Sequence, residues 1–327
     1  MPAITLSNVT KRYGDVTAVR DIDLTVESGE IYGFLGPNGA GKSTTINMLL
    51  DFVRPTDGTI EVLGESVAEN GVSIRERTGV LPEGFDVYSR LSGRKHIEFA
   101  IDSKKAADDP DEILSRVGLS EAADRNAGGY SKGMRQRLAL GMALVGEPEL
   151  LILDEPSSGL DPGGAKEMRD IVTAEADRGA TVFFSSHVLG QVEAVCDRVG
   201  ILHEGELVVE DSMEGLRTSA DSEETLILTV DDATDDDLDA VRALAGVSGA
   251  AIDGDIVTVA CESATKTTVI STLGEAGIEI LDIETDSTSL EELFLSYTEG
   301  EGVVGDAEST ADGTRATQAA TPPEGAQ

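Results

Sequence analysis

Polar and apolar residues alternate in two stretches near the N-terminus, residues 3–10 and 18–26. Alternation with a period of two is typical of a strand with one buried face, so the two stretches predict an antiparallel pair joined through residues 13–15. Residues 31–35 form an apolar run that predicts another strand. A helical pattern over residues 45–50 follows, so the chain changes from strand to helix between the two.

In the middle of the chain, the spacing of apolar residues changes from a strand pattern to a helical pattern and back again. Short strands are expected over residues 59–63 and 78–81, and a helical insertion over about residues 88–147. The apolar positions of the insertion predict helices over residues 97–101, 111–117 and 134–145. An apolar run at residues 150–153 indicates a fully buried parallel strand. We expect helices and strands to alternate after it, with helices over residues 165–177 and 188–196 and strands over 181–184, 199–202 and 207–209. This alternation predicts an α/β sheet layered by helices.

A polar stretch at residues 219–224 marks the start of a second unit. We expect its strands over residues 225–230, 247–252, 256–260 and 278–282, and its helices over residues 235–244, 264–276 and 290–297. This order predicts a small α+β unit of the split-βαβ, ferredoxin-like type. From residue 299 onward Gly, Thr, Ala, Pro and Glu dominate without periodicity, which is typical of a disordered tail. The predicted domains are therefore residues 1–218 and 222–298, followed by an acidic tail over residues 299–327.

The formal net charge of −37 is the strongest feature of the composition. Such an excess of acid disfavours electrostatic capture of nucleic acid or of an anionic membrane surface, so no nucleic-acid partner is expected. The acidic residues are spread along the whole chain, and only eight of the basic residues are lysines. That composition is typical of a protein adapted to concentrated salt, which screens the repulsion among like charges. The competing explanation for the excess of acidic residues is that it determines which partners the protein binds.

Other features of the composition favour a globular protein in a reducing cytosol. Hydrophobic residues make up 40% of the chain, and no apolar stretch approaches the roughly 20 residues that span a bilayer. The N-terminus has no basic region followed by an apolar core, so we expect no secretory signal. The two cysteines, Cys196 and Cys261, form no C-x-x-C pair, which argues against a disulfide framework or a zinc site.

A glycine-rich loop between the predicted strand 31–35 and the helix after it matches the phosphate-loop pattern G-x-x-x-x-G-K-[ST]. Its residues are Gly36, Pro37, Asn38, Gly39, Ala40, Gly41, Lys42, Ser43 and Thr44. The glycines let successive backbone N–H groups face an anion, and the helix adds its positive N-terminal end. Lys42 would reach the outer phosphates of a nucleotide, and the Ser43 hydroxyl would complete the ligand shell of a Mg²⁺ ion.

An acidic pair, Asp154 and Glu155, follows the buried strand at residues 150–153. Asp154 at the strand end can hold the water shell of the same Mg²⁺, and Glu155 can polarise a water molecule in line with the terminal phosphate. A surface pair that caps the strand is the alternative interpretation. Tyr13, at the end of an early strand, can stack on a flat ligand or can be an ordinary half-exposed aromatic residue.

The order of motifs resembles that of the nucleotide-binding subunit of ATP-binding cassette (ABC) transporters, over about residues 3–216. The resemblance rests on the phosphate loop, the Tyr-Ser-Lys-Gly-Met-Arg-Gln-Arg sequence at 130–137, the Asp154-Glu155 pair, Ser-Gly-Leu-Asp at 158–161 and Ser-Ser-His at 185–187. It implies an α/β phosphate-loop ATPase fold with a RecA-like core, an antiparallel β subdomain and a helical subdomain. It also implies that the bound ligands are ATP and Mg²⁺.

The resemblance implies roles for individual residues. Tyr13 would stack on adenine, Glu155 would be the catalytic base, and His187 would contact the γ-phosphate as the switch histidine. Asp161 would lie in the loop that crosses to a second subunit.

The family signature is Leu-Ser-Gly-Gly-Gln, and here Tyr130, Lys132 and Met134 replace its first, third and fifth residues. Ser131 and Gly133 remain, and they would open a helix whose N-terminus faces the nucleotide of the opposite subunit. We expect reduced side-chain contact and retained activity.

A second departure lies after the strand 78–81, expected to be central, where the family commonly has a glutamine and this chain has Glu83. Glu83 would still offer an oxygen to the metal or water, but with a charge. Both variants resemble the export-type branch, which includes antibiotic-resistance and sodium-export ATPases. That branch often carries a small C-terminal domain.

The resemblance implies the ATPase subunit of an exporter, cytoplasmic and held on the inner face of the membrane by a separate transmembrane permease. Two such subunits, expected to be identical, would close head to tail over two nucleotides, and about residues 85–96 would transmit closure to the permease. A soluble cassette ATPase that acts on ribosomes or DNA is the rival hypothesis, although such proteins typically have two cassettes or basic insertions. The C-terminal unit could stabilise the dimer, dock on the permease or bind a small regulatory ligand. The transported substrate would be selected by the permease.

Overall fold

A computed structural model describes residues 1–222, 224–231 and 233–287 of the chain. An antiparallel sheet formed by the N-terminal strands has the order β2-β1-β4-β5. Its strands are β1 (Pro2–Tyr13), β2 (Val16–Glu27), β4 (Asp57–Val62) and β5 (Glu65–Ser66). The predicted pair of alternating strands is confirmed, since Leu6 of β1 faces Leu24 of β2 and both side chains are buried.

A six-stranded sheet has the order β10-β9-β3-β8-β7-β6. Its strands are β3 (Ile31–Leu35), β6 (Thr78–Leu81), β7 (Leu150–Asp154), β8 (Thr181–Ser186), β9 (Arg198–His203) and β10 (Glu206–Ser212). All neighbouring strands are parallel except β9 and β10, which form an antiparallel hairpin at one edge. Every residue of β3, β7 and β8 is buried, as expected for parallel strands covered on both faces. The strand before Glu83, expected to be central, is instead the edge strand β6.

The helices beside this sheet begin or end differently from the sequence-based expectation. They are α1 (Lys42–Leu49), α2 (Val67–Glu76), α6 (Pro162–Asp177), α7 (Leu189–Glu193) and α8 (Met213–Ser222). The sequence pattern predicted a helix from residue 45, but α1 begins earlier, at Lys42. Its N-cap residue is Gly41, which has a left-handed backbone conformation. Helix α2 was not predicted, since Gly71 and the non-helical Asn70 interrupt its periodicity. Helix α8 was also not predicted, and it runs across the expected domain boundary near residue 218.

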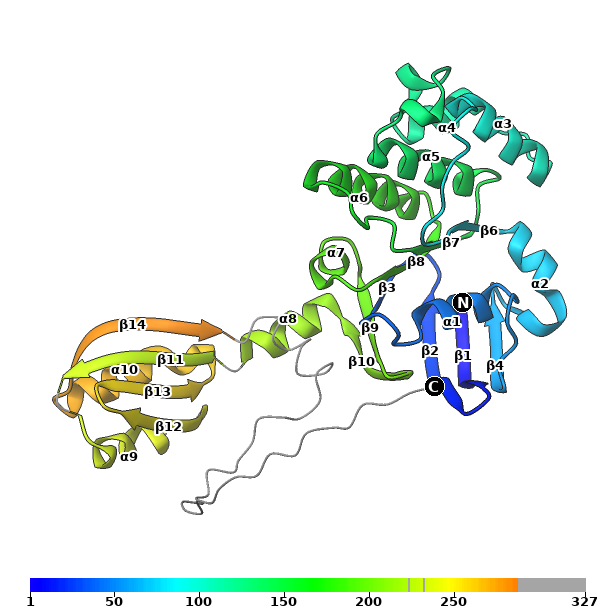
Figure 1. Cartoon of the computed structure of the whole chain (residues 1–327). Helices are drawn as coiled ribbons and strands as arrows, with labels where there is room; N and C mark the ends of the chain where they lie inside the picture. The colour runs from blue at the N-terminus through cyan, green and yellow to red at the C-terminus, as the bar shows by residue number, and fades with distance from the viewer. Residues whose placement is uncertain (223, 232, 288–327) are drawn as a thin grey trace, which may run out of the picture.

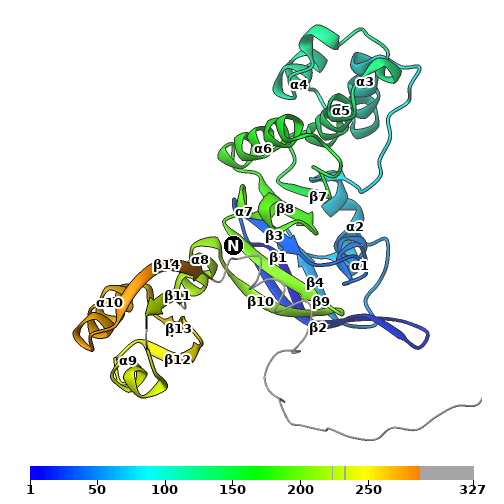
Figure 2. The same ribbon diagram turned by 60° about the vertical axis from the view of Figure 1, so that its left-hand side comes forward.

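The helices of the predicted insertion lie together at one end of the molecule, away from the antiparallel sheet (Figures 1 and 2). They are α3 (Gly93–Lys104), α4 (Pro110–Arg116) and α5 (Lys132–Leu144), with short 3₁₀ turns η1 (Ser120–Ala122) and η2 (Ala127–Gly129). The side chains of Ser92, Asp109 and Ser131 accept hydrogen bonds from backbone N–H groups in the first turns of α3, α4 and α5. Apolar residues on their inner faces, including Ile97 and Leu138, join the core under the six-stranded sheet.

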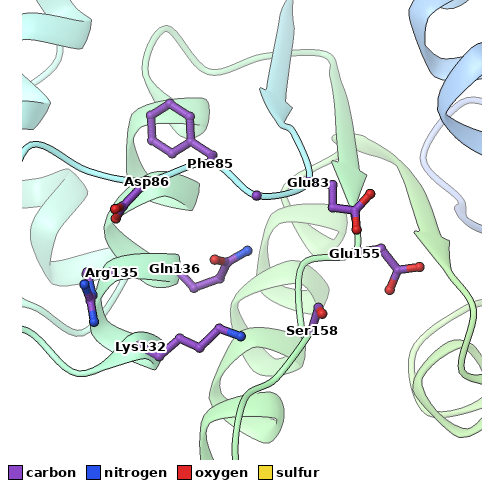
Figure 3. Close-up of a pocket in the computed structure, with 9 residues that line it drawn as sticks. Glu83, Phe85, Asp86, Lys132, Arg135, Gln136, Glu155 and Ser158 are labelled. Carbon is purple, nitrogen blue, oxygen red and sulfur yellow. The ribbon is translucent and has the colours of Figure 1, made fainter. Parts of the chain in front are cut away.

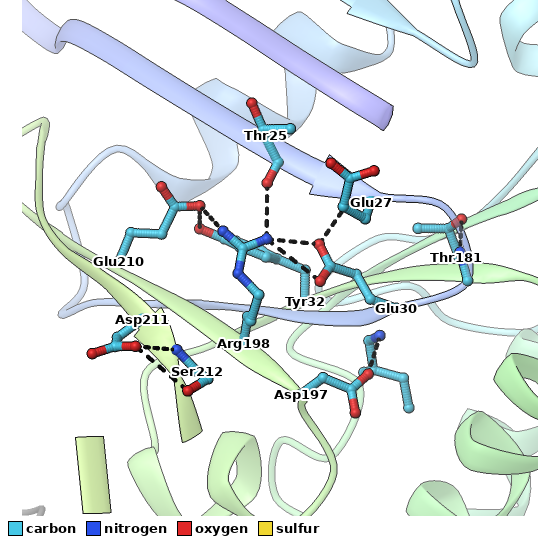
Figure 4. A network of polar contacts seen from close by, with 12 residues as sticks. Thr25, Glu27, Glu30, Tyr32, Thr181, Asp197, Arg198, Glu210, Asp211 and Ser212 are labelled. Carbon is cyan, nitrogen blue, oxygen red and sulfur yellow. Dashed lines mark hydrogen bonds and ion pairs between the residues drawn. The ribbon is translucent and has the colours of Figure 1, made fainter. Parts of the chain in front are cut away.

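A polar network ties the two sheets together around Arg198 of β9 (Figure 4). Its guanidinium lies 3.0 Å from Glu30 Oε1 and 2.7 Å from Glu210 Oε1, and it donates a hydrogen bond of 3.2 Å to the Thr25 carbonyl oxygen. The same group covers the ring of Tyr32, at 5.5 Å from the centroid. Tyr32 is fully buried and donates a hydrogen bond to Glu210, and burial raises the pKa of its phenol well above the usual value. One arginine therefore joins strands β2, β9 and β10 and the residues at the start of β3.

The C-terminal unit has its own core and a four-stranded antiparallel sheet. Its elements are β11 (Glu224–Asp231), η3 (Asp235–Leu238), α9 (Asp239–Arg242), β12 (Val247–Asp253), β13 (Ile256–Cys261), η4 (Ser263–Thr265), α10 (Lys266–Glu275) and β14 (Glu279–Ser287). The sheet order β12-β13-β11-β14 is the one that the predicted split-βαβ arrangement requires. The expected helix 290–297 and tail 299–327 lie outside the described residues. Within the described residues, no helix has the length and apolarity needed to cross a membrane.

Candidate functional site

The phosphate loop curls between β3 and α1 with the help of three glycines. Gly39 and Gly41 have φ values of 87° and 113°, in the left-handed region that other residues rarely adopt. Gly36 is needed for a different reason, because a Cβ there would lie 2.3 Å from the Leu202 carbonyl oxygen. The backbone N–H groups that open α1 therefore face the space above the loop, where an anion would bind.

Lys42 is buried at the start of α1, with 8% of its side chain exposed. Its Nζ donates hydrogen bonds to the carbonyl oxygens of Gly36 at 2.6 Å and Pro37 at 3.2 Å. Glu155 Oε1 lies 3.9 Å from the same nitrogen. Burial lowers the pKa of Lys42, whereas the nearby carboxylates of Glu155, Asp154 and Glu83 oppose that shift. The ammonium is thus held inside the loop by oxygens that the phosphates of a ligand could replace.

Asp154 ends β7 and is almost completely buried, with 6% of its surface exposed. Burial raises the pKa of its carboxyl group and the carboxylates of Glu83 and Glu155 raise it further, whereas the nearby Ser185 hydroxyl and Lys42 lower it. Its Oδ1 has no hydrogen-bond partner among the described residues. A buried oxygen that lacks a partner, next to other carboxylates, is suited to a hard cation such as Mg²⁺. Ser43, whose side chain is exposed in the first turn of α1, offers a second oxygen of the same chemistry.

Glu155 follows Asp154 and has an unusual backbone conformation. Its φ of 50° is left-handed, which is uncommon for a residue with a side chain, and its N–H donates a hydrogen bond to the Ser185 carbonyl oxygen. Glu155 Oε1 lies 2.8 Å from Nδ1 of His187, which follows β8. The second oxygen, Oε2, is buried without a hydrogen-bond partner in the described part of the chain. Such local strain is concentrated at functional sites, and here it aims the carboxylate at His187 and Lys42.

A cleft of about 430 Å³ adjoins this cluster (Figure 3). Lys132 and Gln136 extend from α5 toward the loop that carries Glu155 and Ser158, and Glu83 lies next to Glu155. The full lining is Glu83, Gly84, Phe85, Asp86, Lys132, Arg135, Gln136, Glu155 and Ser158. Sequence reasoning included Asp86 only in the segment 85–96 that was expected to transmit closure, and it gave no individual role to Arg135 or Gln136. Helical spacing could have indicated the last two, which lie one turn after Ser131 and Lys132.

The remaining predicted residues lie outside this cluster. Tyr13 ends β1 with 48% of its surface exposed, and Lys11 Nζ lies 4.9 Å from the centroid of its ring. The Ser131 hydroxyl accepts a hydrogen bond of 3.2 Å from the Met134 N–H, so it caps α5, which begins at Lys132. Asp161 is exposed and caps α6 in the same way, through the Gly164 N–H at 3.1 Å.

In the segment that corresponds to the family signature, Gly133 lies in the first turn of α5, two residues after Ser131. In the phosphate loop, Pro37, Asn38, Ala40 and Thr44 lie between the glycines or in the first turn of α1, and only Ala40 among them is buried. The structure therefore brings the loop, Asp154, Glu155 and His187 together within one subunit. Among the described residues, Tyr13, Ser131 and Asp161 make their contacts elsewhere, with Lys11, Met134 and Gly164.

Comparison with known proteins identifies the family. The family profile described as ABC transporter matches residues 19–158. The bacitracin transport ATP-binding protein BcrA of Bacillus licheniformis is 43% identical over 220 residues, which are 65% of this chain and 71% of that protein. The daunorubicin resistance ATP-binding protein DrrA3 of Streptomyces coeruleorubidus is 33% identical over 305 residues, 90% of this chain and 96% of that protein.

The fold comparison agrees. The solved structure of cbiO1 from Clostridium perfringens, part of the ABC transporter complex cbiONQ, matches with a TM-score of 0.61 and 26% identity, covering 66% of this chain and 91% of that chain. The match to the family profile includes the phosphate loop and the strand that leads to Asp154. The chain therefore belongs to the family of ABC transporter ATP-binding proteins.

Proposed function

We propose that this chain is the ATP-hydrolysing subunit of a multi-subunit ABC exporter and drives a separate transmembrane permease. The observation that supports this most directly is the convergence of Lys42, Asp154, Glu155 and His187 at the carboxyl ends of β3, β7 and β8. These strands are neighbours in the sheet, so they deliver a cation, two carboxylates and an imidazole to one place.

ATP would bind with its phosphates over the phosphate loop. The N–H groups at the start of α1 would donate to the phosphate oxygens, and Lys42 would turn from the carbonyls of Gly36 and Pro37 to the outer phosphates. Tyr13 is about half exposed, so its ring could stack on the adenine.

Mg²⁺ would be held by Ser43 and by the unpartnered oxygen of Asp154, with Glu83 near enough to affect the pKa of that carboxyl. When bound, the ion supplies positive charge that offsets the negative charge of the phosphates.

Hydrolysis requires a base that can accept a proton from water. Glu155 has one oxygen directed at His187 and a second, buried oxygen without a hydrogen-bond partner among the described residues, and this second oxygen would accept the proton of the attacking water. His187, with 42% of its side chain exposed, holds the first oxygen and can also reach toward the γ-phosphate. We therefore assign Glu155 as the general base and His187 as the residue that orients it.

A complete site would require a second copy of this chain. The capped N-terminus of α5, with Ser131, Lys132 and Gly133, presents backbone N–H groups at the surface, where the nucleotide of a partner could bind. Asp161 lies at the start of α6 on the loop that would cross to that partner. ATP binding would then close a homodimer head to tail, and hydrolysis would reopen it.

The permease would bind beside the helical subdomain. A groove of about 310 Å³ between β6, α3 and α5 is lined by apolar side chains that include Phe85, Phe99 and Met142. Phe85 and Phe99 are 40% and 60% exposed and line the same groove, and exposed apolar side chains that lie together mark interaction sites. Through such a contact the protein would lie in the cytoplasm, on the inner face of the membrane. The names of BcrA and DrrA3 refer to bacitracin transport and daunorubicin resistance, and they support export as the direction of transport.

The Glu155→Gln variant tests the assignment of the base. It keeps the size and hydrogen-bonding capacity of the side chain but cannot take up the proton, so turnover should fall about 100-fold or more while ATP binding persists. Phosphate release and a Mg-ATP titration measure the two properties. A phosphate-release rate within threefold of the unmodified protein would refute the role of Glu155.

Copurification with ribosomes, instead of with a polytopic membrane protein, would favour the rival hypothesis of a soluble cassette ATPase.

A further inference from the structure

The turn between β9 and β10, residues 204–205, contacts two separate parts of the candidate ATP site. The Gly205 N–H donates a hydrogen bond of 2.9 Å to the carbonyl oxygen of Ala40, inside the phosphate loop. The Gly205 carbonyl oxygen accepts a hydrogen bond of 2.7 Å from the N–H of Arg20, in β2. Both bonds lie outside the regular sheet ladders, so one residue of this turn joins the phosphate loop to the antiparallel sheet.

The packing around this turn leaves no space for a side chain at Gly205. Gly205 has a φ of 85°, and a Cβ there would lie 2.9 Å from the Ala18 carbonyl oxygen. A Cβ at Gly41 of the phosphate loop would lie 2.6 Å from the same oxygen. The carbonyl of Ala18 is therefore enclosed between a glycine of the loop and the glycine of the turn. Figures 1 and 2 both show β10 beside β2, which is the arrangement that brings these three backbones together.

Strand β2 also determines where Tyr13 lies. Tyr13 pairs with Val16 at the end of the β1–β2 hairpin, and Lys11 pairs with Val19, the residue before Arg20. The hydrogen bond from Arg20 to Gly205 thus fixes β2 close to the part of the hairpin that carries the aromatic ring. The neighbouring ion pair between Arg20 and Glu206 is 59% and 51% exposed, and exposed pairs of this kind contribute little. The backbone bonds of Gly205 are the stronger connection.

We infer that Gly205 is a positioning residue for ATP. It fixes the separation between the phosphate loop and the strand pair that carries Tyr13, so that the phosphates and the base are bound at the same time. This inference rests on the proposed function, because it takes ATP as the ligand and Tyr13 as the contact for the base. Gly205 does not touch the nucleotide and acts through Ala40 and Arg20.

The Gly205→Asn variant tests this inference, because asparagine tolerates a left-handed backbone but places a Cβ against the Ala18 carbonyl. Its affinity for Mg-ATP, measured by calorimetry, should fall about three- to tenfold, the effect of losing roughly one hydrogen bond. Affinity for magnesium tripolyphosphate, which has no base, should change less than twofold. The matched control is Gly179→Asn, where φ is 101° and no atom lies within 4 Å of the added Cβ. That variant should bind both ligands as the unmodified protein does.

A double-mutant cycle with Tyr13 distinguishes positioning from general destabilisation. Tyr13→Ala should weaken Mg-ATP binding by itself, and adding Gly205→Asn to it should cause no further loss. Equal losses for Mg-ATP and tripolyphosphate, or additive losses in the double variant, would overturn the inference. Failure of the unmodified protein to bind Mg-ATP would overturn the proposed function together with it.

A second measurement applies if Gly205→Asn does not fold. In the unmodified protein, Mg-ATP should slow amide hydrogen exchange at Arg20 and Gly205 more than magnesium tripolyphosphate does, because only ATP engages both parts that the turn connects. Equal slowing by the two ligands would overturn the inference.

Discussion

We predict that Asp154 destabilises the folded, nucleotide-free protein, because its charge is buried without a full set of partners. Replacing it with asparagine removes the charge and keeps the shape. The raised pKa of this carboxyl means that the folded protein holds the charged form less favourably than water does, with burial as the main cause. Asp154→Asn should therefore increase the free energy of unfolding of the nucleotide-free protein at neutral pH.

The magnitude follows from the cost of an unpaired buried group. Leaving a buried acceptor unpaired costs about 1 to 3 kcal/mol, and more when the group is charged; the neutral amide avoids the part of the cost that is due to the charge, so we expect a gain of about 1 to 2 kcal/mol. A gain of this size corresponds to an increase of about 2 to 8 °C in Tm for a domain of roughly 200 residues.

The pH dependence gives a second, independent signature. Because the folded pKa is raised, the folded protein binds a proton that the unfolded chain does not, between the ordinary value of 3.8 and the folded value. The stability of the unmodified protein relative to the variant is thus greatest at or below the ordinary pKa and falls as the pH rises through the folded pKa. The advantage of Asp154→Asn should be full at neutral pH and should shrink on acidification.

Thermal unfolding with and without Mg-ATP measures these effects. Asp161→Asn is the matched control, since it removes one exposed acid from the same highly charged chain and retains a residue that caps a helix well. Asp154→Asn should raise Tm without ligand but gain less stability from Mg-ATP than the unmodified protein gains. A Tm that is unchanged or lowered relative to Asp161→Asn at neutral pH would refute the reasoning.

Three further outcomes are expected. Lys42→Ala should weaken Mg-ATP binding about tenfold or more, because a charge-assisted contact with the phosphates is lost, and an unchanged dissociation constant in calorimetry would contradict this. Arg198→Met should lower the free energy of unfolding by about 2 kcal/mol, since Glu30 and Glu210 lose their shared partner, and a denaturant titration that shows no shift in midpoint would exclude it. The net charge of −37 predicts that the unfolding midpoint rises between dilute buffer and molar potassium chloride; equal midpoints would rule out salt adaptation.

Local patterns along the chain were sufficient to predict most of the nucleotide-binding elements. The phosphate loop, the buried strand before Asp154 and the alternating strands of the N-terminal pair all depend on residues close together in sequence. Caps such as Ser131 also follow from local chemistry. The exceptions were α2, where Gly71 interrupts the periodicity in order to pack against Asp51, and α8, which has few apolar residues.

Only the tertiary structure decided how these elements combine. The sequence alone did not show that β3, β8 and β7 are adjacent, which is what brings Lys42, Glu155 and His187 into contact. It also did not show the left-handed backbone of Glu155 or the contact between Gly205 and Ala40, residues far apart in the chain. The physical reason is that periodicity and turn chemistry report on a residue's immediate neighbours. Burial, charge interactions and close backbone packing depend on segments that meet only after folding.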